Sequence, residues 1–135
     1  MTTIDTMLGS HPEPSVHADQ DKLAACIRAC LECAQACTTC ADACLSEEMV
    51  ADLTRCIRTD LSCADVCSAT AAVLSRSPEG DARIVTALLQ ACATACAVCA
   101  EECERHAEMH EHCRICAEVC RRCEQACRDL VGTPS

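Results

Sequence analysis

The sequence predicts an all-α fold, an antiparallel up-down-up-down four-helix bundle with a short N-terminal leader. Two observations support this prediction. Eighteen cysteines occur in 135 residues, and nearly all of them recur at intervals of three or four. Because an α-helix turns once in about 3.6 residues, this spacing places the cysteines along one face of a helix. The cysteine runs also fall into stretches of similar length with short connections, as an antiparallel bundle requires.

The first long helix is expected to begin near residue 18 or 19 and to end at about Leu45. Asp19 and Asp21 favour this beginning, because carboxylates stabilise the positive end of the helix dipole. The six cysteines in this stretch follow one another at steps of 4, 3, 4, 3 and 4. This is the spacing of a coiled-coil seam, with sulfur where leucine is usual. The six are Cys26, Cys30, Cys33, Cys37, Cys40 and Cys44.

A second helix is predicted over 47–76, after a turn and an N-cap at 46–48. The sequence Ser-Pro-Glu-Gly at 77–80 is expected to end it, since Pro and Gly break helices. One charged residue, Asp60, interrupts its seam. Asp60 could bond to a nearby polar group or trapped water, or it could contact thiols or a metal ion. The seam consists of Met49, Leu53, Cys56, Asp60, Cys63, Cys67, Thr70 and Leu74.

A third helix is predicted over 81–105 and a fourth over 110–130, although neither Gly nor Pro separates them. The alternation of steps from Cys96 predicts a seam position at 117, but the cysteine is at 116, so the phase slips. An unbroken helix would be roughly 75 Å long at about 1.5 Å per residue, with nothing to cover it. We therefore predict a tight hairpin near 105–110. The two seams are Val85, Leu89, Cys92, Cys96, Cys99, Cys103 and His106, and then Cys113, Cys116, Cys120, Cys123, Cys127 and Leu130.

The length suits one domain. Before the bundle, Ile4, Met7 and Leu8 could form a short amphipathic turn, which Gly9 and the prolines at 12 and 14 would then break. Gly132 and the proline at 134 are expected to close the last helix. The predicted divisions are a leader at 1–17, the bundle at 18–131 and a tail at 132–135.

Composition excludes several classes of function. The formal net charge of −10 argues against nucleic acid and against an anionic membrane surface as partners. The N-terminus lacks the basic and apolar regions of a secretory signal, and we find no stretch of the ~18 apolar residues that a membrane span needs. We therefore expect a cytoplasmic protein, in which thiols stay reduced. There is no Phe, Tyr or Trp, so small residues must fill the core.

Antiparallel packing predicts which residues lie at the same level of the bundle, and so a tube lined with thiols. Cys44 would lie level with Met49 and His106. Cys37 would lie level with Cys56, Cys99 and Cys116. Cys33 would lie level with Asp60, Cys96 and Cys120. Cys30 would lie level with Cys63, Cys92 and Cys123.

The two ends of the predicted tube differ. One end would be an apolar plug of Leu23, Leu74, Leu89 and Leu130. The other would carry Met49, His106, Met109 and His110, whose sulfur and nitrogen atoms can bind a soft metal and pass it inward. These four could equally be gap-filling Met and ordinary surface His. His11, His17 and His112 have no comparable position.

Several interpretations of the thiols compete. Buried Cys can serve as a small hydrophobe, but Ala or Val would pack as well without the risk of oxidation. Disulfides between neighbouring turns would close tiny loops and constrain the unfolded chain little. A thiol oxidoreductase or redox sensor needs an exposed thiolate of low pKa, whereas the seam predicts buried thiols. Zinc with four thiolates carries a charge of −2, and several such sites in one dry tube would repel one another.

Cu(I) fits the pattern best. Thiolates select Cu(I) by their softness, and each Cu(I) that replaces a thiol proton leaves the core neutral. Many ions can therefore fill one core without accumulating charge, to about one ion per cysteine. We expect a store for Cu(I) with no catalytic residues and no enzymatic turnover. The metal ligands are then expected to be the eighteen cysteines, with His106, Met109, His110 and Met49 at the open end.

Over residues 20–130 the chain resembles the cytosolic branch of the bacterial copper storage protein family. The run Cys113-Arg-Ile-Cys116-Ala-Glu-Val-Cys120-Arg-Arg-Cys123-Glu-Gln-Ala-Cys127 is the most specific part of the resemblance, and the run from Cys26 to Cys44 matches equally well. The resemblance implies many Cu(I) ions per bundle, a homotetramer, and a mouth lined by His106, Met109 and His110. A copper chaperone or chelator would act as donor or acceptor. Apolar residues off the seam, on flanks suited to subunit contacts, are Leu31, Leu45, Leu61, Val98 and Ile115.

Overall fold

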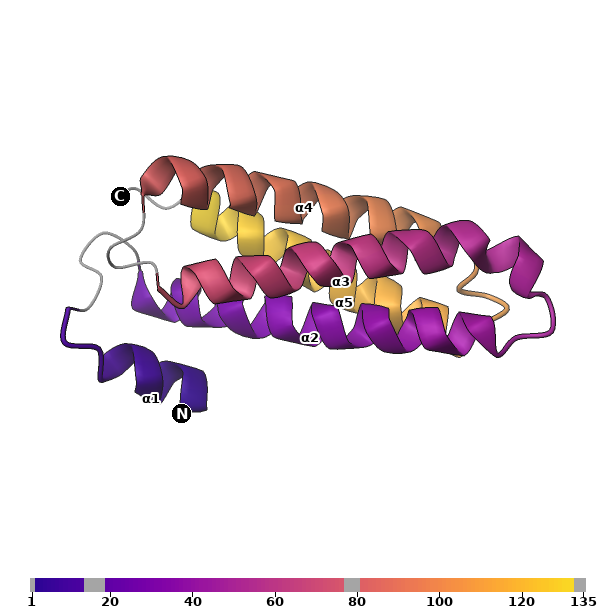
Figure 1. Cartoon of the computed structure of the whole chain (residues 1–135), viewed down its shortest axis with the longest axis horizontal. Helices are drawn as coiled ribbons and strands as arrows, with labels where there is room; N and C mark the ends of the chain where they lie inside the picture. The colour runs from indigo at the N-terminus through magenta and orange to yellow at the C-terminus, as the bar shows by residue number, and fades with distance from the viewer. Residues whose placement is uncertain (1, 14–18, 77–80, 133–135) are drawn as a thin grey trace.

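The computed structural model describes residues 2–13, 19–76 and 81–132, and all regular structure within them is helical. Four long helices lie side by side as a bundle (Figure 1). They are α2 (Gln20–Leu45), α3 (Thr54–Leu74), α4 (Ala82–Glu104) and α5 (Glu111–Val131). A short helix, α1 (Thr3–Gly9), precedes α2, and a 3-10 turn, η1 (Val50–Leu53), precedes α3. The prediction of an all-α fold is confirmed.

Side-chain caps fix where two of the long helices begin. The carboxylate of Asp19 accepts hydrogen bonds from the backbone N–H groups of Asp21 (2.9 Å) and Lys22 (3.2 Å), at the start of α2. Asp81 accepts one from the N–H of Arg83 (2.8 Å) at the start of α4. These N–H groups have no partner within the helix, so the caps satisfy them. The predicted beginnings of the first and third long helices are confirmed.

The connection between α2 and α3 is longer than the sequence suggested. Ser46 is the C-cap of α2 rather than the N-cap of the next helix, and α3 begins only at Thr54. Leu53 enters the core with 1% of its surface exposed, whereas Met49 is 49% exposed. The chain uses residues 46–53 to turn, so the predicted helix start at 47 is wrong. The predicted hairpin near 105–110 is confirmed, because α4 ends at Glu104 and α5 begins at Glu111.

The end of the bundle opposite these two connections is apolar. Leu23, Leu74, Leu89 and Leu130 are all buried in the core cluster. The short helix α1 lies beside α2 at this end (Figure 1), with Leu8 buried and Asp5 3.2 Å from the guanidinium of Arg28. Gly132 is the C-cap of α5, as expected. The predicted breakers at 77–80, Pro14 and Pro134 lie outside the described residues.

Helix α4 is long and apolar enough to cross a membrane, judged by length and composition alone. The expectation that no stretch meets this measure is wrong for α4. Its cysteines Cys92, Cys96, Cys99 and Cys103 are 0% exposed within the bundle. Because the same residues form the wall of the protein core, we assign α4 to the bundle.

Candidate metal centre

All eighteen cysteines are free thiols, and none has more than 1% of its surface exposed. Burial of this kind favours the protonated thiol over the thiolate. At Cys44, for example, burial raises the pKa of the thiol to about 12. A metal ion that binds in this core must therefore displace protons from thiols.

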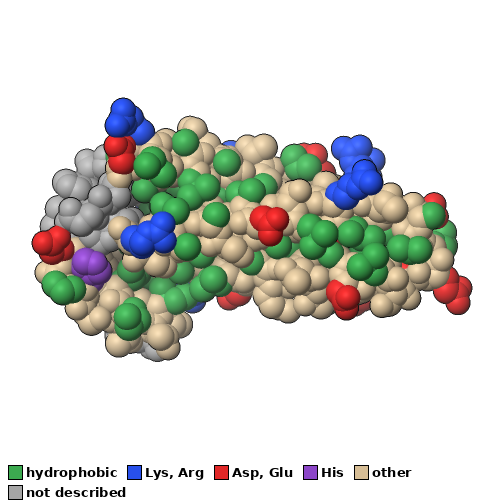
Figure 2. Space-filling model, in the orientation of Figure 1, with side chains coloured by type: hydrophobic (Ala, Val, Ile, Leu, Met, Phe, Trp, Pro, Cys, Tyr) green, Lys and Arg blue, Asp and Glu red, His purple; other side chains and the backbone are tan. Residues whose placement is uncertain are grey.

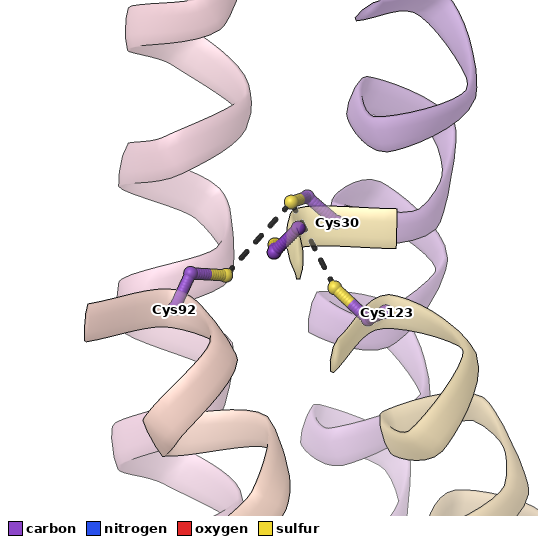
Figure 3. Close-up of side chains that lie close together, drawn as sticks. Cys30, Cys92 and Cys123 are labelled. Atoms are coloured by element: carbon purple, nitrogen blue, oxygen red, sulfur yellow. Dashed lines mark hydrogen bonds between the residues drawn. The ribbon is translucent and has the colours of Figure 1, made fainter. Parts of the chain in front are cut away.

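The sulfur atoms of α2 face those of α4 and α5 at the predicted levels. Cys30 lies 3.9 Å from Cys92 and 3.8 Å from Cys123, sulfur to sulfur (Figure 3). One turn further on, Cys33 lies 4.0 Å from Cys96 and 3.7 Å from Cys120. The next turn repeats the pattern, with Cys37 3.8 Å from Cys99 and 3.7 Å from Cys116. These contacts confirm the expected register of three of the four helices.

Helix α3 lies one step away from its predicted register. Cys63 was expected level with Cys30, but its sulfur is 3.8 Å from those of Cys33 and Cys96. Cys67 takes the place beside Cys92, at 3.8 Å. The long connection at 46–53 explains the shift, because a tight turn at 46–48 would have paired α3 with α2 three to four residues earlier.

The sulfurs form one continuous array rather than separate sites. Groups of four thiols, with all sulfurs within 4.8 Å of one another, overlap by sharing members such as Cys33 and Cys37. An isolated tetrahedral zinc site would need its four sulfurs for itself. Five of the groups are Cys30, Cys92, Cys123 and Cys127; Cys33, Cys63, Cys67 and Cys96; Cys33, Cys37, Cys63 and Cys120; Cys37, Cys99, Cys116 and Cys120; and Cys40, Cys44, Cys56 and Cys113.

Asp60 lies within the sulfur array and is 0% exposed. Its oxygen Oδ1 accepts hydrogen bonds from the thiols of Cys99 (3.1 Å) and Cys116 (3.3 Å). Burial away from water, together with the neighbouring sulfurs, raises the pKa of this carboxyl to about 11. Asp60 is therefore a neutral acid at pH 7. Of the two interpretations of Asp60, the structure therefore supports contact with thiols.

The mouth of the array lies where α2 and α4 end and where α5 begins. His106 follows α4, and its Nε2 lies 3.0 Å from Oε2 of Glu102, one turn earlier. The Glu102 side chain is 7% exposed, and its Oε1 faces Arg55 of α3 at 3.4 Å. The sequence reasoning did not single out Glu102, although its spacing of four from His106 is a readable signal.

His112 reaches the thiols, although the sequence predicted no position for it comparable to those of His106 and His110. Its Nδ1 lies 3.5 Å from the sulfur of Cys40 and 3.6 Å from that of Cys113. Its Nε2 lies 2.8 Å from Oε2 of Glu47, and the same oxygen lies 3.0 Å from Nδ1 of His110. His112 is 65 residues from Glu47 in the chain, so no local spacing could reveal this cluster.

The two methionines of the open end are less enclosed than its histidines. Met109 is 66% exposed and Met49 is 49% exposed. His11 lies beyond α1 and accepts a hydrogen bond from the backbone N–H of Glu13 (2.9 Å). His17 lies outside the described residues. The mouth therefore consists of three partly buried histidines held by carboxylates, with exposed thioethers nearby.

This arrangement suits a soft monovalent ion. A redox sensor would need at least one exposed thiol, whereas all eighteen are buried. Sulfurs shared between neighbouring groups can each bridge two ions, and replacement of thiol protons by Cu(I) adds no net charge. The array can therefore hold many Cu(I) ions together.

Comparison with known structures yields close relatives. The copper storage protein Ccsp from Streptomyces lividans, loaded with 10 copper equivalents, is 61% identical with a TM-score of 0.95, over 97% of this chain and 99% of its own. The cytosolic copper storage protein of the same organism with five coppers is 66% identical with a TM-score of 0.83, over 85% and 96%. The Cu(I)-bound copper storage protein BsCsp3, of Bacillus subtilis, is 34% identical with a TM-score of 0.72, over 80% and 96%.

No curated protein matches the chain. The copper storage protein family, however, matches residues 19–132, which include every cysteine and the whole mouth. The resemblance found in the sequence is confirmed. The chain belongs to the copper storage protein family.

Proposed function

We propose that this protein is a cytosolic store for Cu(I), which binds many ions through cysteine thiolates inside the bundle and catalyses no reaction. The observation that carries the proposal is the continuous array of eighteen buried thiols. Each incoming Cu(I) binds sulfur as a thiol proton leaves, so a filled core stays neutral. The cytosolic relative with five coppers and the relative with 10 copper equivalents support both the compartment and the cargo.

The four long helices are proposed to run up-down-up-down within one domain at 18–131, between a leader at 1–17 and a tail at 132–135. Sulfur pairs support this order. Cys33 of α2 lies 3.7 Å from Cys120 of α5, and towards the mouth Cys40 lies 3.9 Å from Cys113. Residue numbers therefore increase along α2 in the direction in which they decrease along α5, as in an antiparallel pair.

The proposed ligands are all eighteen cysteines and the donors of the mouth. His106, Met109, His110 and Met49 would pass ions inward by ligand exchange. To these we add His112, because its Nδ1 already lies beside two thiols. A copper chaperone or a small chelator is the proposed donor and acceptor at this end.

Anaerobic titration of the reduced protein with Cu(I), against a competing coloured chelator, tests the proposal. We expect binding to continue to about one Cu(I) per cysteine, because each ion replaces one thiol proton. Zinc provides the control: it should saturate at about four ions or fewer, since each takes four thiolates. A Cu(I) capacity near four would contradict storage.

We further propose a homotetramer. Figure 2 shows hydrophobic side chains spread over the face formed by α2, α3 and α4, with few charged side chains between them. Leu31 and Leu61 are each 48% exposed, and Val98 is 42% exposed. Exposed apolar surface of this kind often marks contacts between subunits.

Light scattering coupled to size-exclusion chromatography tests the assembly. We expect a mass of four times the 14.4 kDa of one chain, both before and after copper loading. Measurement of the reduced protein avoids intermolecular disulfides. A mass of one chain at micromolar concentration would contradict the tetramer.

A further inference from the structure

Two carboxylates hold the three histidines of the mouth. We propose that Glu47 and Glu102 are positioning residues, which select the ring nitrogen that each histidine offers to an incoming Cu(I). This inference rests on the proposed function, since it assigns a role within the path by which copper enters. It concerns how the mouth is organised rather than how much copper the core holds.

Glu47 sets two histidines in opposite orientations. Its Oε2 lies 3.0 Å from Nδ1 of His110 and 2.8 Å from Nε2 of His112. An ionised carboxylate only accepts hydrogen bonds, so each of these nitrogens must carry the proton. The rings stack with centroids 5.5 Å apart, which fixes the pair further. His110 is therefore left with a free lone pair on Nε2, and His112 with one on Nδ1.

The nitrogen left free on His112 is the one that faces the thiols. Its Nδ1 is 3.5 Å from the sulfur of Cys40 and 3.6 Å from that of Cys113. The opposite tautomer would turn an N–H group towards those sulfurs and offer no lone pair to a metal there. Glu47 thus determines whether His112 can share an ion with the first cysteines of the array.

Glu102 acts in the same way on His106. Its Oε2 lies 3.0 Å from Nε2 of His106, which leaves Nδ1 of that ring without a bonded partner among the described residues. Arg55 (3.4 Å) and Arg105 (4.0 Å) hold the other oxygen, Oε1. The Glu102 side chain is only 7% exposed, and its contact with Arg55 joins α4 to α3.

General chemistry explains why this selection matters. A neutral imidazole binds a metal through one nitrogen, and the hydrogen bond made by the other nitrogen fixes the tautomer and the ring orientation. Loss of such a partner typically costs about 10-fold to 100-fold in metal affinity or activity. A purely structural ion pair would depend on the charge of the glutamate, whereas positioning depends on its oxygen as an acceptor.

Substitution can separate the negative charge of each glutamate from its ability to accept a hydrogen bond. Glu47→Gln and Glu102→Gln remove the charge but keep an oxygen that can accept the same hydrogen bond. Glu47→Ala and Glu102→Ala remove both. The matched controls are Glu48→Ala and Glu108→Ala, which remove exposed carboxylates from the same end of the bundle.

Nitrogen-15 NMR of the reduced, metal-free protein reads the tautomers directly. At about pH 8.5, where imidazole is ordinarily neutral, we expect the Nε2–H form for His106 and His112 and the Nδ1–H form for His110. The alanine variants should convert these to mixtures, while the glutamine variants and the controls should keep them. Opposite or mixed tautomers in the unsubstituted protein would overturn the proposal.

Stopped-flow loading from Cu(I) bound to bicinchoninate supplies the second readout. The rate for the first equivalents should fall about tenfold in Glu47→Ala and Glu102→Ala, with less than a twofold change in the glutamine variants and the controls. Equal slowing in the glutamine variants would show that charge is responsible and would overturn positioning. So would unchanged rates in the alanine variants.

The two proposals can fail separately. If His106→Ala and His112→Ala slow loading but the glutamate variants do not, the proposal that the glutamates position the histidines is wrong. The role of the histidines in copper entry would still be supported. If the total capacity of the unsubstituted protein is near four Cu(I), the storage function itself falls. Circular dichroism of each variant establishes that the helices are intact before rates are compared.

Discussion

Loading with ten or more Cu(I) ions is expected to raise the unfolding midpoint of the reduced protein by about 20 °C or more. Ligands that bind only the folded state stabilise it by about 4 kcal/mol each when present at 1,000 times their dissociation constant. Several ions bound at once would therefore add more than about 10 kcal/mol. For a domain of this length, each added kcal/mol moves the midpoint by about 2–8 °C.

The size of this effect follows from which helices the ions connect. Cys33 of α2 is within 4.0 Å of sulfurs on α3, α4 and α5, so ions at this level would join all four helices. The metal-free core has no such links and no aromatic residues, and most of its buried side chains are cysteine and alanine. Copper would therefore replace weak packing by bonds between helices.

Thermal unfolding followed by circular dichroism, under anaerobic conditions, measures the change. Removal of copper by an excess of a strong Cu(I) chelator should restore the midpoint of the metal-free protein. A rise of less than about 5 °C with ten ions bound would contradict the expectation. Ions held only by pairs within one helix, such as Cys63 and Cys67 at 3.9 Å, would give that result.

The sequence predicted the thiol tube because a single physical rule governs it. Steps of three and four put Cys30, Cys33 and Cys37 on one face, and the sulfurs of α4 and α5 meet them where expected. The hairpin near 105–110 was equally readable, since the phase slips there and an unbroken helix of roughly 75 Å would have had nothing to cover it. Regular spacing in sequence thus translates directly into regular spacing in space.

The register of α3 and the structure of the mouth could not be predicted in this way. Leu53 is buried, as its place in the predicted seam implies, but residues 46–53 turn instead of continuing as α-helix, and no local pattern expresses that path. His112 does not belong to the cysteine seam, and its position depends on contact with Glu47, which lies in the connection between α2 and α3. Such contacts depend on loop geometry, and loops have no repeating rule.

Replacement of Asp60 by Asn is expected to stabilise the metal-free protein by about 2 to 4 kcal/mol at pH 7. Burial raises the pKa of Asp60 to about 11, against an ordinary value of 3.8 in the unfolded chain. Between these values the folded state keeps a proton that the unfolded state has lost. Stability must therefore fall as pH rises through this range, by at most about 1.4 kcal/mol per pH unit.

Asn removes this cost because its amide does not ionise and its oxygen can still accept the thiol hydrogen bonds of Cys99 and Cys116. At about pH 4, close to the ordinary pKa of 3.8, the unfolded state keeps the proton in a large fraction of molecules, so the advantage of Asn should fall below about 1 kcal/mol. Urea unfolding of the reduced protein at pH 4, 5.5, 7 and 8 measures the trend. Asp65→Asn, at an exposed position of the same helix, is the control and should not reproduce it. A gain that is equal at every pH would mean that Asp60 is ionised in the folded protein at pH 7. The core would then contain a fixed negative charge, whereas neutral copper loading requires an uncharged core.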